Sequence, residues 1–84
     1  MNQPICLNDL RPGEHATVLA LRSTGSMRRR LLDLGLIAHT KVECVGKSPG
    51  GDPHAYLIRG AVIAIRAADG RDILVQPDED RAWD

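Results

Sequence analysis

Turn-forming residues interrupt this chain so often that no regular element can be long. The breaks fall at 11–13, 23–26 and 47–54, at Gly60, and at 67–71. The segments between them have room for short strands, but not for the repeated crossover helices that a doubly wound parallel sheet requires. The turn spacing therefore favours a small, mainly β fold.

Five segments between these breaks have the composition and pattern of strands, namely 15–22, 41–45, 55–59, 61–66 and 72–76. The first of them is apolar on both alternating faces, which is typical of a strand covered on both sides. Closing such short strands into a barrel removes the sheet edges that invite aggregation. We therefore expect a small five-stranded barrel.

Only residues 27–34 have the period of a helix. Met27, Leu31 and Leu34 lie at i, i+4 and i+7 and so share one face. Ser26 is a suitable N-cap, and Gly35 is suited to the left-handed conformation that follows a helix. The sequence thus predicts one short helix, which must be stabilised by packing because helices of this length are marginal alone.

The 84 residues are enough for a single domain, for which we expect the bounds 1–76. Residues 77–84 are polar and acidic, and we expect them to form a flexible C-terminal tail. With no Phe, one Tyr and one Trp, the core must consist of Leu, Ile, Val and Ala. The chain has neither a membrane-length apolar segment nor the layout of a secretory signal, so we expect it in the cytoplasm.

The sequence contains no motif that points to catalysis. Gly50-Gly51-Asp52-Pro53 resembles a phosphate loop in its glycines, but it lacks the lysine and does not lead into a helix. We therefore expect neither an enzyme nor a cofactor.

Metal ligands are not spaced in pairs along this chain. Cys6 and Cys44 stand alone, and we expect both thiols to be packed in the interior. A metal, if one bound, would be sought at His39 or His54 with Asp52, but we expect no metal site.

Arg28, Arg29 and Arg30 form the most concentrated charge in the sequence. Three consecutive residues of a helix span about 200°, so they cannot all face one partner. Guanidinium groups suit carboxylates or a nucleotide phosphate on another protein, or anionic lipid, whereas a solvated face is the simplest alternative. Any exposed member of Leu32, Leu36 and Ile37 beside these arginines would add an adhesive apolar patch.

Several segments together resemble the FeoA family. They are Leu-Asn-Asp-Leu at 7–10, Arg-Pro-Gly at 11–13, Met-Arg-Arg-Arg-Leu-Leu-Asp-Leu-Gly-Leu at 27–36, Ser-Pro-Gly-Gly-Asp-Pro at 48–53 and Ile-Arg-Gly-Ala-Val-Ile-Ala-Ile-Arg at 58–66. The resemblance covers residues 5–76. The combination of the Arg-Arg-Leu-Leu-Asp-Leu-Gly segment with the Gly51-Asp52-Pro53 loop makes it specific.

The resemblance implies an SH3-like barrel that serves bacterial ferrous iron uptake. It implies a small cytosolic accessory to a membrane ferrous iron permease that carries its own G-domain. The partner-binding residues expected on this basis are Arg28, Arg29, Arg30, Leu32 and Leu36. One departure is that Ala38-His39 stands before Thr40 where the family usually has Pro-Gly, so we expect that turn to persist but to be looser.

Two other roles remain open at the level of sequence. An arginine of the helix could reach a nucleotide on the partner and regulate its GTP hydrolysis. A small barrel could also bind nucleic acid, but a net charge of zero disfavours a general nucleic-acid binder, so we expect no nucleic acid among the partners.

Overall fold

A computed structural model describes residues 3–78 of the protein. Its elements are β1 (Ile5–Cys6), the 3-10 helix η1 (Leu7–Asp9), β2 (His15–Leu21), α1 (Gly25–Asp33), β3 (Lys41–Lys47), β4 (His54–Ile58), β5 (Ala61–Ile65), α2 (Ala67–Gly70) and β6 (Ile73–Pro77). None of the helices in this part of the chain is both long enough and apolar enough to cross a membrane.

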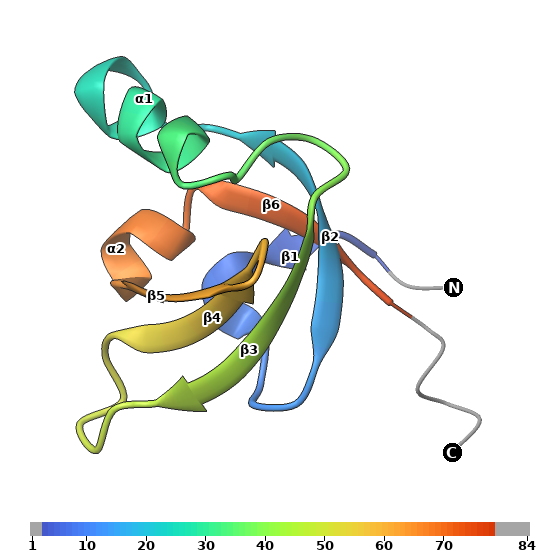
Figure 1. The fold of residues 1–84 in the computed structure, drawn as a ribbon, viewed down its shortest axis with the longest axis vertical. Helices are drawn as coiled ribbons and strands as arrows, with labels where there is room; N and C mark the ends of the chain where they lie inside the picture. The colour runs from blue at the N-terminus through green and yellow to red at the C-terminus, as the bar shows by residue number, and fades with distance from the viewer. Residues whose placement is uncertain (1–2, 79–84) are drawn as a thin grey trace.

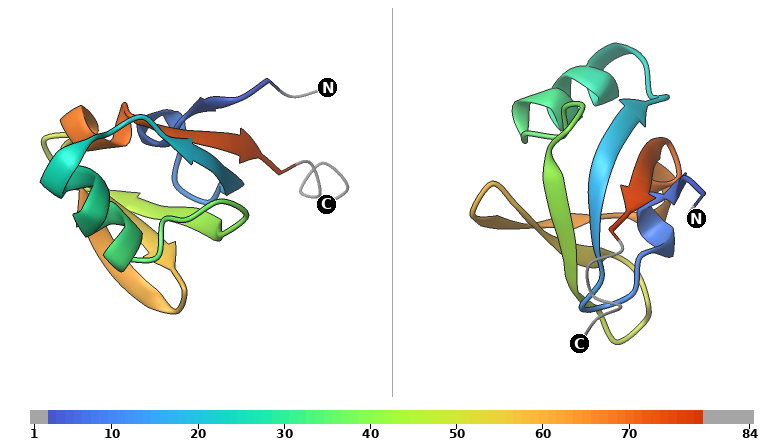
Figure 2. Two further views of the ribbon diagram at one scale, coloured as in Figure 1. Left: turned by 90° about the horizontal axis from the view of Figure 1, so that it is seen from above. Right: turned by 90° about the vertical axis from the view of Figure 1, so that its right-hand side faces the viewer.

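The six strands form one antiparallel sheet in the order β1-β6-β2-β3-β4-β5 (Figure 1). The sheet bends strongly, so that β4 and β5 lie across from β6, as the two turned views show (Figure 2). Register shifts between Val18 and Ala20 and between Cys44 and Gly46 contribute to this bend, because a bulge kinks its strand and increases its twist.

The predicted mainly β fold with a short helix is confirmed, with differences in detail. The sheet has six strands rather than five, and β1 and β5 are its two ends, so the sheet bends without closing. Strand β1 escaped prediction because two residues are too few to show alternation, although it pairs with β6 through Ile5 and Val75. Residues 67–71, expected as a plain turn, contain the single-turn helix α2.

The core fills the concave side of the bent sheet, beneath α1 and η1. Its buried apolar residues are Leu7, Leu10, Ala16, Val18, Leu31, Leu36, Val42, Cys44, Tyr56, Ile58, Ile65, Ile73 and Val75. Leu, Ile and Val dominate this set, as the composition predicted. The hydroxyl of Tyr56 donates a hydrogen bond to the carbonyl oxygen of Leu7 at 3.3 Å, which links β4 to η1.

The residues expected to begin the C-terminal tail contact the sheet. Pro77 ends β6, and the backbone N–H of Asp78 donates to the carbonyl oxygen of His15 at 3.0 Å. The Asp78 carboxylate accepts hydrogen bonds from Thr17 Oγ1 at 3.3 Å and from Lys41 Nζ at 3.1 Å. The rest of the expected tail, 79–84, lies outside the described residues.

Helix α1 ends in a Schellman motif at the predicted glycine. The N–H of Leu36 donates to the carbonyl oxygen of Leu31 at 3.1 Å, and the N–H of Gly35 donates to that of Leu32 at 3.0 Å. Gly35 has φ +105°, and Leu31 and Leu36 are both buried, which completes the apolar contact that accompanies this motif. The position of the helix end relative to the core is therefore fixed.

The start of α1 differs from the prediction. The helix begins at Gly25, so Thr24 rather than Ser26 occupies the N-cap position, and Thr24 makes no side-chain capping bond. Gly25 has φ +63°, a conformation that glycine adopts at little cost. This glycine lets the chain turn into the helix ahead of the expected residue.

The turn after α1 persists without the proline and glycine usual in the family. His39 takes the left-handed conformation with φ +76°, and its N–H donates to the carbonyl oxygen of Val18 at 2.8 Å. The N–H of Val18 donates in return to the carbonyl oxygen of Thr40 at 2.8 Å. These two bonds hold the turn against β2.

We predict that Gly35→Ala destabilises the fold by about 2 kcal/mol. An added Cβ would have an unfavourable φ and would lie 2.6 Å from Cδ of Arg59. Gly13→Ala is the matched control, because Gly13 has a similar φ of +93° but open space around it. Urea denaturation should show the larger loss of unfolding free energy for Gly35→Ala; an equal loss in both variants would contradict the packing argument.

Candidate functional site

Helix α1 stands at one end of the bent sheet and is attached along a single face (Figure 2). Leu31 is buried on that face, while Met27 and Leu34 are half-buried and pack against the core. The predicted apolar stripe is thus the attachment of the helix. The remaining faces of α1 are available to a partner.

The three arginines of α1 are all exposed, and they lie on two sides of the helix. Arg28 Nη1 donates to the carbonyl oxygen of Leu21 at 3.1 Å, which ties its guanidinium to the end of β2. Within residues 3–78, neither Arg29 nor Arg30 makes a side-chain hydrogen bond or an ion pair. Both guanidinium groups are therefore free to meet anionic groups of another molecule.

A shallow depression of about 260 Å³ lies on the outer side of α1, lined by Gly25, Arg28, Arg29, Leu32 and Asp33. We refer to it as the α1 depression. Leu32 is half-buried, and on the helix it lies one turn from both Arg28 and Arg29. The structure thus brings together three of the five residues expected to bind a partner.

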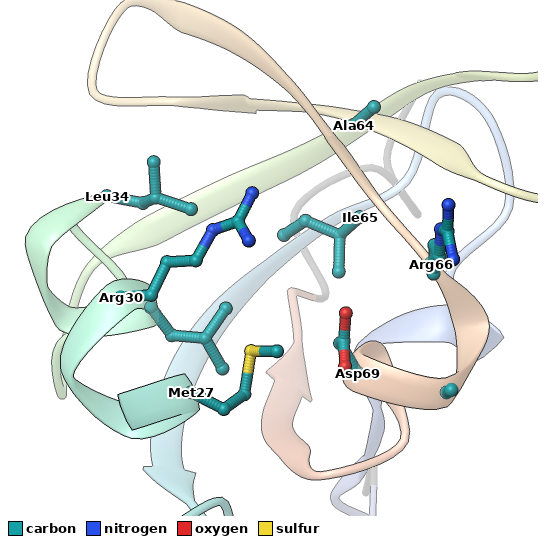
Figure 3. Close-up of a pocket in the computed structure, with 9 residues that line it drawn as sticks. Met27, Arg30, Leu34, Ala64, Ile65, Arg66 and Asp69 are labelled. Carbon is teal, nitrogen blue, oxygen red and sulfur yellow. The ribbon is translucent and has the colours of Figure 1, made fainter. Parts of the chain in front are cut away.

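Arg30 lines a second and larger hollow on the opposite side of the helix. This hollow, the α1–β5 groove, has a volume of about 520 Å³ and is shown in Figure 3. Its lining consists of Met27, Arg30, Leu31, Leu34, Ala64, Ile65, Arg66, Ala68 and Asp69. Sequence patterns could not reveal it, because its walls come from α1, β5 and α2, which the bend of the sheet brings together.

Leu36 does not belong to the exposed surface, contrary to the sequence expectation. Its side chain is fully buried, because the Schellman motif turns it back against Leu31. The neighbouring Ile37 is exposed by 43% instead. Leu36 therefore supports the helix end and does not contact a partner in this conformation.

The loop between β3 and β4, which contains Gly51, Asp52 and Pro53, lies at the far end of the sheet from α1 (Figure 1). Asp52 Oδ1 accepts a hydrogen bond from the backbone N–H of Ala67 at 2.8 Å. This bond caps the first turn of α2, whose own N-cap residue makes no side-chain capping bond. Asp52 thus positions α2, which forms one wall of the α1–β5 groove.

No group of three or more His, Cys, Asp or Glu side chains in the described part of the chain is placed to hold a metal ion. His54 is buried, and its Nδ1 lies 3.2 Å from the hydroxyl of Tyr56. Cys44 is also buried, and desolvation raises the pKa of its thiol. His54 and Cys44 are thus part of the packed interior, as expected for Cys44.

Comparison with known proteins identifies the family. The model of the FeoA domain matches residues 5–77. Two solved structures are similar at 31% identity and a TM-score of 0.82. One is the FeoA protein of Chlorobium tepidum, with 89% of this chain and 74% of that chain covered. The other is a FeoA-like protein of Clostridium acetobutylicum, with 92% and 90% covered.

A third similar structure is that of zinc-complexed FeoA from Stenotrophomonas maltophilia, at 25% identity and a TM-score of 0.76. The match covers 84% of this chain and 88% of that chain. That protein is described as a prokaryotic SH3 domain protein and a candidate ferrous iron transport activating factor. The SH3-like character predicted for the fold is thereby confirmed. No curated protein sequence matches the chain.

We predict that Asp52→Ala weakens the attachment of α2. Without the carboxylate of Asp52, the N–H of Ala67 would hydrogen-bond only to water, which lowers the unfolding free energy by about 1 kcal/mol. Hydrogen exchange should show faster exchange at Ala67 in the variant. Asp33→Ala is the control, because Asp33 is exposed on α1, far from α2 along the chain; unchanged exchange at Ala67 in Asp52→Ala would contradict the assignment.

Proposed function

Because the chain belongs to the FeoA family, we propose that it is an accessory protein of ferrous iron transport that binds the cytosolic part of a ferrous iron permease bearing a G-domain. The proposed role is to support or regulate transport from the cytoplasmic side by binding. It requires no catalytic residue in this chain.

The α1 depression is the observation that supports this role. It combines two exposed guanidinium groups, Arg28 and Arg29, with the half-buried side chain of Leu32. A guanidinium group can form two parallel hydrogen bonds to one carboxylate. An adjacent leucine adds an apolar contact from which water is excluded. A partner surface with an acidic pair around an apolar residue would match this depression.

A second role for the same surface is regulation of the partner's GTP hydrolysis. It is favoured by the exposed Arg29, which has no side-chain partner within residues 3–78 and could reach a bound nucleotide. An arginine supplied by one protein to the nucleotide of another stabilises the charge of the transition state. Stimulated GTP hydrolysis would distinguish this role from simple docking.

We predict that Arg28→Glu combined with Arg29→Glu weakens permease binding at least about tenfold and abolishes permease-dependent iron uptake. Folding should be retained, because exposed substitutions usually change stability little. Binding by calorimetry and uptake of radioactive ferrous iron in cells measure the two effects.

The control for this experiment is Arg11→Glu combined with Arg71→Glu, which changes the charge equally at exposed positions outside α1. It should leave binding and uptake close to wild type. Equal losses in both double variants would show an effect of net charge alone, and normal uptake in a folded α1 variant would contradict the proposed surface.

A further inference from the structure

Strand β5 is an end strand of the sheet, and its pairing with β4 fixes which of its backbone groups are free. Arg59 and Gly60 connect the two strands with φ values of +52° and +86°, as in a two-residue type I′ turn. Such a turn makes Ile58 and Ala61 a hydrogen-bonded pair. Hydrogen-bonded and non-hydrogen-bonded pairs then alternate along the hairpin.

The alternation makes Leu57 with Val62, and Ala55 with Ala64, the non-hydrogen-bonded pairs. The N–H and C=O groups of Val62 and Ala64 therefore point away from β4, toward the open edge of the sheet. No hydrogen bond to these groups is present within residues 3–78. The strand Ala61–Ile65 also contains no charged residue or proline of the kind that blocks an exposed edge.

The α1–β5 groove adjoins this edge. Met27 and Leu34 of α1 and Ile65 of β5 supply apolar parts of its lining, beside the charged side chains of Arg30, Arg66 and Asp69 (Figure 3). The guanidinium of Arg30 points into the groove from α1, and Asp69 lies on the opposite wall, on α2. No salt bridge joins the two, so Arg30 is left to bind an anion.

We propose that the edge of β5 and the α1–β5 groove together bind an extended segment of a partner protein, which adds to the sheet as a further strand and places a carboxylate on Arg30. Residues of the segment opposite Val62 and Ala64 supply the backbone bonds. Residues opposite Ile63 and Ile65 point to the core side and fill the groove with apolar side chains.

An extended polypeptide suits these features better than a compact ligand. The free groups of Val62 and Ala64 are two residues apart, about 7 Å along the strand, which is the repeat of another β-strand. Val62 is exposed by 66%, so the outer side of the added strand would remain in solvent and needs polar residues. The expected sequence alternates apolar and polar residues and carries an acidic residue at an end.

This site is separate from the α1 depression used for the proposed docking. Arg30 lines the groove, whereas Arg28 and Arg29 line the depression on the other side of the helix. Substitutions in one site should leave the other intact. Failure of one proposal is therefore distinguishable from failure of the other.

The test is binding of the peptide acetyl-Glu-Thr-Val-Thr-Val-Thr-Glu-amide to the full chain, in which both glutamates lie on the same face of the strand as the two valines. A carboxylate at each end allows one of them to reach Arg30 in either strand direction. In ¹H–¹⁵N NMR spectra, the amides of Val62 and Ala64 should shift and should exchange more slowly with solvent. The same peptide N-methylated at all three threonines, which cannot form the backbone bonds, should bind at least tenfold more weakly.

Two variants separate the groove from the remainder of α1. Arg30→Glu should weaken peptide binding at least tenfold, whereas Arg29→Glu, with the same change of charge on the adjacent residue, should not.

A third variant tests the edge of β5. Ala64→Pro removes only an N–H that faces the open edge, so the variant should fold but should bind the peptide weakly.

Four results would overturn the proposal. They are no binding of the unmethylated peptide at millimolar concentration, equal binding of the methylated peptide, equal loss in Arg29→Glu and Arg30→Glu, and a dimer of the free chain joined through β5 in solution. The last result would show that a second copy occupies the edge. The methylated peptide decides the question even if Ala64→Pro fails to fold.

Discussion

The Schellman end of α1 is the constraint on which both surfaces of the helix depend. Gly35 reverses the chain with a positive φ, and the reversal presses Leu36 against Leu31 inside the core. The side chain of Arg59 packs directly over Gly35, so the helix end also contacts the tip of the β4–β5 hairpin. Gly35 thus lies where the end of α1 meets the β4–β5 hairpin.

The orientation that results gives a two-turn helix two different surfaces. Because consecutive helical residues are about 100° apart, Arg28 and Arg29 border the outer depression, whereas Arg30 borders the groove toward β5. The groove also depends on α2, whose first turn is capped by Asp52 from a distant loop. The Gly-Asp-Pro loop lies at the far end of the sheet from α1, but through α2 it contributes to the same groove that the Arg-rich helix borders.

Much of the fold was predictable from local signals. Gly35 as the residue after the helix, the strands from β2 to β6 and the loop between β3 and β4 follow from turn residues and alternation, which depend on neighbours in sequence. Strand β1 and helix α2 were missed because each is stabilised from outside its own segment, by pairing with Val75 and by the carboxylate of Asp52. The residue pattern of these short segments gives no indication of partners that are distant in the sequence.

The candidate site was predictable only in part. Helical geometry showed that three adjacent arginines must diverge, but the exposure of Leu36 could not be judged without the reversal at Gly35, and its side chain is buried. The α1–β5 groove could not be predicted from the sequence, because the bend of the sheet brings together residues as far apart in the chain as Met27 and Asp69.

Calorimetric titration of the protein into the detergent-solubilised, full-length permease from the same cell tests the central claim most directly. The titration is carried out with GDP, with a non-hydrolysable GTP analogue and without nucleotide. The account predicts saturable binding in at least one of these states. Absence of binding in all three, confirmed by a second method at micromolar concentration, would contradict it.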